Sequence, residues 1–271
     1  MRNAVQLVLQ ALPERGAAGE AERVFCCEEI EPYLIDVPRA DVDALASRLA
    51  RAGARETPHG MPAGYLEELA EFWACGFDWR KAEARLNDHP HYLTRVEGQA
   101  LHFVHVRSGD RGALPLLLVH DRPGTFVQYL DVLDALSRDF DVVVPSVPGS
   151  GLSVPLSGPW WTTAKIAKAF DELMCRLGYR RYHVEGAGTG ALIAMELDRR
   201  AAEHVLGAHF DWMPPAPPPG DSPAELLAWF AARSARWAGR LPTEADEREQ
   251  LLTGVSLHAL TARPSARPAF N

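Results

Sequence analysis

Residues 182–190 read YHVEGAGTG, a strand-like run followed by three glycines at alternate positions. The run Tyr182–Glu185 predicts a buried strand, and the pattern over Gly190–Arg200 predicts a helix. A glycine turn between a strand and a helix lies at the edge of a parallel sheet where ligands bind. This stretch therefore decides the fold class and shows where a site is expected.

Strand-like runs flank this turn on both sides, and helical patterns separate the later ones. The predicted strands are Leu101–Val106, Leu114–Val119, Asp141–Val144, Tyr182–Glu185 and Val205–Phe210. The predicted helices are Leu130–Leu136, Thr163–Leu177 and Gly190–Arg200. This alternation predicts the α/β class, with a doubly wound and mostly parallel sheet.

The chain divides into four regions and shows no internal repeat. Residues 1–30 have little periodicity and are expected to be a leader without a site of its own. Residues 31–92 predict a small helical domain, and residues 93–213 hold the sheet. Residues 214–271 begin with a proline run that blocks regular structure, which predicts a linker into a final helical segment.

Two amphipathic patterns define the small helical domain. Asp41 is placed to cap a helix over Val42–Ala52, in which apolar residues recur at helical spacing. The second pattern carries Tyr65, Leu66, Leu69, Phe72 and Trp73.

Charge and composition narrow the class of partner. The chain of 271 residues has 28 Lys and Arg against 36 Asp and Glu, a net charge of -8, which argues against nucleic acid and favours a small apolar molecule. Its four cysteines form no C-x-x-C pair, and no histidines lie at metal-ligand spacing, so neither a metal nor a cofactor is expected. They are Cys26, Cys27, Cys75 and Cys175.

The beginning of the chain bears on location. Val5–Leu12 is apolar but short, it contains Gln6 and Gln10, and it leads into Pro13 rather than a cleavage site. The sequence therefore predicts neither a signal peptide nor a membrane anchor, and we expect a cytoplasmic protein.

Three junctions between strands and helices are placed to carry chemistry. Residues 120–124 read HDRPG directly after a strand, where a turn can aim backbone N–H groups into a cleft as half of an oxyanion hole. Residues 145–153 read PSVPGSGLS, a loop that is also compatible with a plain turn. Residues 185–190 occupy the position at which a hydrolase sheet places its nucleophile elbow.

These segments resemble a known family. The HDRPG loop is similar to the H-G-W-P-G oxyanion loop of microsomal-type epoxide hydrolases, and residues 141–149, DVVVPSVPG, resemble their D-V-V-V-P-S-L-P-G segment. Residues 77–80, FDWR, and the following 83–108 resemble the junction between the N-terminal and hydrolase domains of that family. From about Tyr33 onward the chain is identified as a member of the microsomal and juvenile-hormone epoxide hydrolases, of the α/β-hydrolase superfamily.

The resemblance implies a two-step hydrolysis of an epoxide to a vicinal diol. In the family an elbow Asp opens the epoxide to an alkyl-enzyme ester, lid tyrosines hydrogen-bond the alkoxide, and a His with an acidic partner activates water. Gly188 stands where this Asp is expected, and Val255 stands where a lid Tyr is expected. The His and its acid lie beyond Asn271 in relatives, so the resemblance predicts a catalytically degenerate protein.

Other parts of the site are expected to persist in altered form. The backbone N–H groups of Arg122 and Thr189 are candidate oxyanion-hole donors, and glycine at position 188 relieves on the order of 1 kcal/mol of elbow strain. Asp121 and Arg122 replace the Gly and Trp of the family's loop and so change its pocket. The candidate pocket residues are His120, Asp121, Pro123 and Pro148.

The sequence leaves three functions open. The chain either retains epoxide hydrolysis or is a non-catalytic relative that binds a ligand or a partner. A third reading takes Gly186-x-Gly188-x-Gly190 as the turn of a nucleotide-binding, Rossmann-like domain, with Asp211 as the ribose-binding acid.

The last predicted strand raises a question of assembly. Relatives add two further strands beside the segment that corresponds to Val205–Phe210, so this strand is expected to form an exposed edge. We therefore expect self-association or a partner chain that covers this edge.

Overall fold

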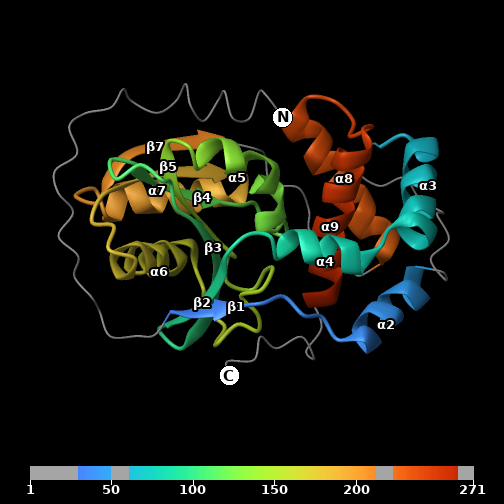
Figure 1. Ribbon diagram of the computed structural model, residues 1–271, viewed down its shortest axis with the longest axis horizontal. Helices are drawn as coiled ribbons and strands as arrows, with labels where there is room; N and C mark the ends of the chain where they lie inside the picture. The colour runs from blue at the N-terminus through green and yellow to red at the C-terminus, as the bar shows by residue number, and fades with distance from the viewer. Residues whose placement is uncertain (1–29, 50–60, 212–221, 262–271) are drawn as a thin grey trace. The chain divides into compact units, whose positions relative to one another are not determined.

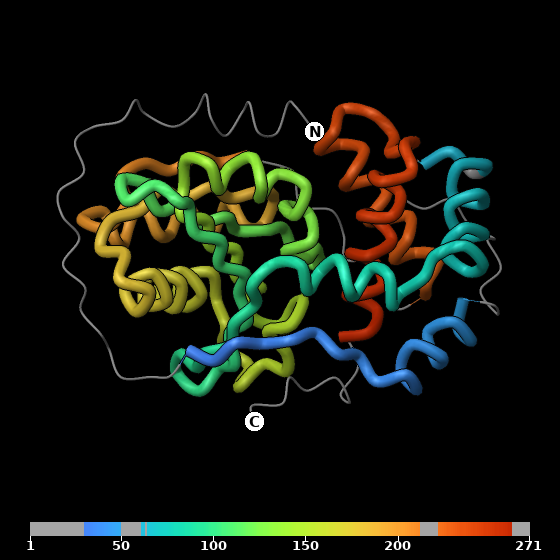
Figure 2. The backbone as a smooth tube through the Cα atoms, viewed as in Figure 1, coloured from blue at the N-terminus to red at the C-terminus, as the bar shows by residue number. Residues whose placement is uncertain are grey.

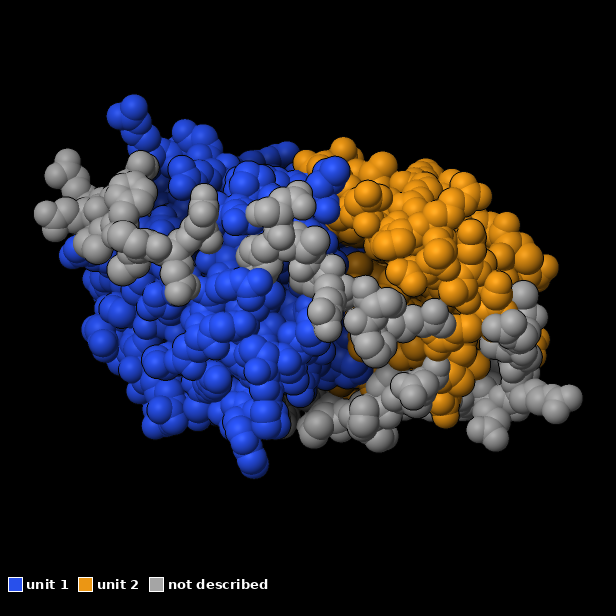
Figure 3. Space-filling view, turned by 90° about the horizontal axis from the view of Figure 1, so that it is seen from below, with its two compact units in different colours: residues 1–34, 89–215, 267–271 blue, residues 35–88, 216–266 orange. Residues whose placement is uncertain are grey.

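The computed structural model describes residues 30–49, 61–211 and 222–261, and these form two compact units, coloured in Figure 3. Of the described residues, unit 1 holds 30–34 and 89–211, and unit 2 holds 35–49, 61–88 and 222–261. Unit 2 therefore joins described helices from before the sheet strands of residues 91–211 to described helices from after them.

Unit 1 is built on a seven-stranded sheet of order β1-β2-β3-β5-β4-β6-β7 (Figure 1). Its strands are β1 Glu31–Tyr33, β2 His91–Val96, β3 Gln99–Val106, β4 Leu114–Val119, β5 Phe140–Pro145, β6 Tyr182–Ala187 and β7 Val205–Asp211. The pairs from β1 to β5 are antiparallel, and β5, β4, β6 and β7 run parallel. The predicted α/β class with a doubly wound sheet is confirmed.

The antiparallel end contains two strands that sequence reasoning missed. β2 and β3 form a hairpin in which Val96 pairs with Gln99, so Glu97 and Gly98 alone make the turn. Both have positive φ, 50° and 77°, which is the conformation that a two-residue hairpin turn requires. The predicted helical region therefore ends before His91, and strand β1 precedes it.

Helices cover both faces of the sheet. They are the 3-10 helix η3 Phe126–Tyr129 and the α-helices α5 Leu130–Leu136, α6 Thr163–Arg176 and α7 Thr189–Arg200. The face that contains Leu117 and Val119 packs against α6 and α7, with Phe170 of α6 fully buried. Leu116 and Leu118 point to the other face because strand side chains alternate, and they are equally buried. Burial of each such side chain away from water contributes about 1.5–3 kcal/mol to the stability of the fold.

Unit 2 is helical. Its helices are α2 Arg39–Leu49, α3 Ala63–Glu71, the π-helix η2 Phe72–Gly76, α4 Trp79–Leu86, α8 Pro223–Ala238 and α9 Ala245–Thr261. Figure 2 shows α8 and α9 beside α3 and α4. The indole of Trp73 donates to Ser256 Oγ at 2.8 Å, and the hydroxyl of Tyr65 donates to the Pro242 carbonyl at 2.8 Å. Helical segments from before and after the sheet in sequence therefore share one core in unit 2.

Helix α2 begins earlier than the sequence predicts. α2 starts at Arg39, so Asp41 lies in its first turn and does not cap a helix that begins at Val42. The reason is Pro38. Its carbonyl accepts hydrogen bonds from the N–H groups of Asp41 and Val42 at 2.9 and 3.3 Å, and these bonds form the first turn of the helix.

A helix that crosses a bilayer must be both long and apolar. None of the described helices combines the length and the apolar composition that this requires. The segment Val5–Leu12, considered above, lies outside the described residues.

Candidate functional site

The predicted sharp turn forms between β6 and α7. Gly188 has φ 57° and ψ -119°, and the helix begins at the next residue, Thr189. The N–H of Gly188 donates to the carbonyl of Asp211 at 3.0 Å, which ties the turn to the end of β7. A side chain would be strained in this conformation, whereas glycine adopts it at little cost. The elbow therefore exists in this chain, and its central residue offers no side chain for reaction.

The other two glycines of the turn allow α7 to approach the sheet closely. A Cβ atom on Gly190 would lie 2.2 Å from the carbonyl oxygen of Val119, and one on Gly186 would lie 2.4 Å from that of Gly190. Real Cβ atoms do not come so near to backbone oxygens. Helix-to-sheet packing thus accounts for both glycines.

The two predicted oxyanion-hole donors converge on one atom. The N–H groups of Arg122 and Thr189 donate to Asp121 Oδ1, with N···O distances of 2.9 and 2.7 Å. The Thr189 hydroxyl donates to the same oxygen at 3.0 Å and accepts the Arg122 N–H at 2.7 Å. Both predicted donors are therefore occupied by the chain's own Asp121 carboxylate.

Burial makes this carboxylate dependent on its donors. Asp121 is 4% exposed, and a buried charge is costly unless it is hydrogen-bonded. Thr189 is the first residue of α7, so the helix N-terminus adds a favourable positive potential. Hydrogen bonds to a charged group contribute about 1.5–3 kcal/mol each, so Asp121 is held firmly in the hole.

His120 connects the loop that follows β4 with the loop that follows β5. It is fully buried; its Nδ1 donates to the Asp121 carbonyl at 2.6 Å, and its Nε2 accepts the Val147 N–H at 2.9 Å. Burial lowers the pKa of His120 to about 4, so the ring is neutral at neutral pH. Both ring nitrogens are used within the protein, so His120 positions the loops.

The remaining predicted pocket residues also lie at this end of the sheet. Pro123 is partly exposed and follows a cis peptide bond, and Pro148 is buried, with its carbonyl accepting from the Arg122 guanidinium at 3.2 Å. The structure therefore brings residues of all three predicted junctions together around Asp121.

Val255, the position at which a lid tyrosine is expected, belongs to the other unit. It belongs to α9 of unit 2 and is fully buried there. It carries no hydroxyl that could donate to an alkoxide.

A buried acid beside the elbow was missed by sequence reasoning. Glu185 on β6 is 2% exposed, and its pKa is raised to about 8 by burial and by the nearby carboxylate of Asp211. Its Oε2 shares a short hydrogen bond with His209 Nδ1. Burial and the proximity of Glu185 also raise the pKa of Tyr129 well above its usual value. An ionisable residue in a fully buried strand was the available signal for this cluster.

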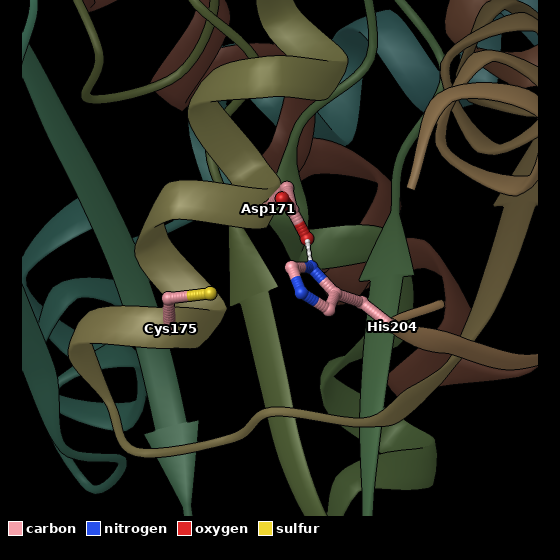
Figure 4. Close-up of side chains that lie close together, drawn as sticks. All are labelled: Asp171, Cys175 and His204. Carbon is pink, nitrogen blue, oxygen red and sulfur yellow. Dashed lines mark hydrogen bonds and ion pairs between the residues drawn. The ribbon is translucent and has the colours of Figure 1, made fainter. Parts of the chain in front are cut away.

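Helix α6 and the connection that leads into β7 hold possible metal ligands. Among the described residues, Asp171, Cys175 and His204 have donor atoms close enough together to share an ion (Figure 4). Spacing along the sequence does not reveal this group, because His204 is distant from the other two residues.

Two protein families match the chain. Residues 115–267 match the family described as alpha/beta hydrolase fold, and residues 30–129 match the family described as epoxide hydrolase N terminus. With its strand order and elbow, the chain belongs to the α/β-hydrolase fold family.

Its relatives are epoxide hydrolases, as the sequence motifs indicate. The chain is 30% identical over 206 residues to epoxide hydrolase 1 of Oryctolagus cuniculus, which covers 68% of this chain and 45% of the relative. It is 32% identical over 161 residues to juvenile hormone epoxide hydrolase 2 of Ctenocephalides felis, which covers 56% of this chain and 35% of that protein. The chain thus spans less than half the length of these relatives.

Solved structures agree on the fold. An enantioselective mutant of the epoxide hydrolase from Aspergillus niger superposes with a TM-score of 0.73 at 23% identity, over 92% of this chain and 79% of that chain. At this identity the likeness establishes the shared fold alone.

Proposed function

We propose that this chain is an epoxide hydrolase-like protein in which the family's reaction has been lost, and that it binds a small apolar molecule without converting it. The observation that carries the proposal is the elbow. Gly188 holds the turn at φ 57° without a side chain, and the Asp121 carboxylate takes up both backbone donors that would stabilise an oxyanion.

The carboxylate of Asp121 is a poor substitute for the missing nucleophile. One of its oxygens accepts three hydrogen bonds, from Arg122 N–H, Thr189 N–H and the Thr189 hydroxyl. These donors stabilise its negative charge and so lower its reactivity towards an epoxide carbon. An alkoxide that developed nearby would also be repelled by this charge instead of meeting N–H donors.

The glycines of the turn do not support the nucleotide-binding alternative. Gly186 and Gly190 are required by helix-to-sheet contacts, and Asp121 places a negative charge against the N-terminus of α7. A phosphate group would have to approach this same helix end.

The test is covalent capture of styrene oxide by the purified chain and its variants. In the Gly188→Asp, Asp121→Gly double variant a carboxylate oxygen returns to the elbow and the donors are freed. Its attack on an epoxide carbon breaks the C–O bond, the alkoxide takes a proton, and an alkyl ester adds the mass of the epoxide. We expect this adduct by intact-protein mass spectrometry in the double variant.

The unmodified chain is expected to form no adduct and no diol, although styrene oxide should raise its unfolding temperature in a saturable manner. The exposed Asp198→Gly variant is a control for the loss of a carboxylate and should behave as the unmodified chain does. Diol formation by the unmodified chain, abolished in Asp121→Asn, would overturn the proposal and identify Asp121 as a replacement nucleophile.

A further inference from the structure

Three side chains with different donor atoms meet at the edge of unit 1. Asp171 and Cys175 are four residues apart on α6, so they share one face of the helix. His204 lies in the connection between α7 and β7, one residue before the strand begins. Figure 4 shows the carboxylate, the thiol and the imidazole directed towards one another, with one donor atom of each within 4.8 Å of the others.

The backbone holds His204 in place. Its N–H donates to the Ala201 carbonyl at 2.8 Å, and its own carbonyl accepts the Tyr182 N–H at 2.9 Å. The backbone of His204 is therefore held between the end of α7 and the start of β6. A site whose ligands come from fixed elements loses little conformational entropy when it binds an ion.

Asp171 is oriented by a buried neighbour. The fully buried Tyr182 donates its hydroxyl to Asp171 Oδ1 at 2.8 Å, and the same oxygen lies 2.8 Å from His204 Nδ1. An outer hydrogen bond of this kind fixes a ligating carboxylate in many metal sites. The second carboxylate oxygen, Oδ2, is not used in these two bonds.

We propose that Asp171, Cys175 and His204 bind a zinc ion, with water as the fourth ligand. Thiolate, imidazole and carboxylate are the donors that Zn²⁺ uses, whereas Ca²⁺ and Mg²⁺ require oxygen ligands. In a tetrahedral zinc site the ligand atoms lie about 3.3–3.8 Å apart, given metal–ligand distances of about 2.0–2.3 Å. The donor atoms here lie within 4.8 Å of one another, and the hydrogen bond of 2.8 Å between His204 Nδ1 and Asp171 Oδ1 has to open for both residues to bind the ion.

The site is separate from the elbow and does not rest on the proposed function. His204 and Tyr182 lie at the amino ends of the parallel strands β7 and β6, whereas Gly188 follows the carboxyl end of β6. The six residues of β6 place about 20 Å between the two ends. Zinc here links α6 to the start of β7 and stabilises the sheet.

The experiment uses the full chain with Cys26, Cys27 and Cys75 changed to Ser, so that Cys175 is its sole thiol. Co²⁺ is added first, because a thiolate bound to Co²⁺ gives a charge-transfer absorption, and Zn²⁺ is then added to displace it. We expect one Co²⁺ per chain, displacement by an equal amount of Zn²⁺, and a rise in unfolding temperature with Zn²⁺.

Variants of the ligands and of Tyr182 test whether these three residues bind the ion. Cys175→Ser should abolish the thiolate absorption. Tyr182→Phe should lower the affinity for Zn²⁺ about ten- to a hundredfold, and His204→Gln should lower it at least as much. The exposed Asp198→Asn is the control and should leave binding unchanged.

Two results would overturn the proposal. One is the absence of both the thiolate absorption and the Zn²⁺-dependent rise in unfolding temperature in the chain with Cys175 as its only cysteine. The other is full Zn²⁺ affinity in His204→Gln, which would place the ion elsewhere. If Cys175→Ser does not fold, the His204→Gln and Tyr182→Phe titrations decide the question by themselves.

Discussion

Two residues near the elbow have complementary effects on its chemistry. Gly188 preserves the backbone conformation of the turn but supplies no carboxylate. Asp121 supplies a carboxylate, but directs it at the donors of Arg122 and Thr189 instead of at a substrate. Under the proposed function, a nucleophile therefore requires both positions to change, one to supply a carboxylate and the other to free the two donors.

Buried histidines make the stability of the chain depend on pH. Burial lowers the pKa values of His105 and His120 to about 4, against 6.5 for an exposed ring. Because the folded pKa is the lower one, the unfolded chain takes up these protons first as the pH falls below 6.5. The free energy of unfolding should therefore fall between pH 6.5 and 4, by about 2 kcal/mol per histidine at about pH 5.

Urea unfolding at about pH 7.5 and about pH 5 measures this fall in the free energy of unfolding. His105 faces Tyr179, Asp141 and Arg107, and its replacement in His105→Gln should reduce the pH dependence. His89→Gln is the matched control, and it should keep the full dependence. Equal stability of the unmodified chain at the two pH values would contradict the prediction.

At the scale of elements, the contact of α7 with β4 depends on the absence of one side chain. Gly190→Ala would bring a Cβ within 2.2 Å of the Val119 oxygen, so helix and strand would have to separate. We expect a loss of about 1–3 kcal/mol or more, although alanine favours helix formation. Gly158→Ala, with no atom within 4 Å of the added carbon, should change stability by less than about 0.5 kcal/mol.

Thermal or urea unfolding of the two glycine variants measures this difference. The N–H of Thr189 at the start of α7 should also lose its hydrogen bond to Asp121 in Gly190→Ala, which amide hydrogen exchange can follow. Unchanged stability of Gly190→Ala would show that the helix can shift without cost.

The elements that local sequence patterns define were predicted well. The strand Leu114–Val119 and the helix Leu130–Leu136 have the predicted bounds, because each is a continuous apolar or helical run. β2 was missed because its strand character depends on pairing with β3 across the turn at Glu97 and Gly98. Local periodicity carries no information on such pairing.

The parts of the site that could not be predicted from the sequence depend on the directions of side chains. The family motifs locate Arg122, Gly188 and Thr189, and the structure brings them to one end of the sheet. That Asp121 turns its carboxylate into the hole depends on one rotamer, and that His204 meets Asp171 depends on where α7 ends. Neither is encoded in spacing along the chain.

At the scale of the whole molecule, β7 pairs only with β6 among the described strands. Phe210 on this strand is 37% exposed, and a partly apolar edge favours pairing with another chain. We expect the protein to self-associate through β7, so that sedimentation velocity shows a larger species as concentration rises.

The variant Phe210→Lys should shift this equilibrium towards the monomer, because a lysine on an edge strand opposes pairing. Trp160→Lys is the control: Trp160 is 78% exposed and lies in a loop, so its loss should leave association unchanged. A monomer at every concentration, or equal association of the two variants, would argue against an edge-to-edge contact.

Unit 2 is built from segments that are far apart in the sequence, and this affects how it folds during synthesis. On the ribosome α3 and α4 emerge early, but α8 and α9, against which they pack, are made only after the entire sheet of unit 1. The pairing of Trp73 with Ser256 closes a very long loop, and such contacts form late because chain entropy opposes them. Helices α3 and α4 are therefore made early but complete their core late, and during translation their apolar faces depend on chaperones or on transient contacts for protection.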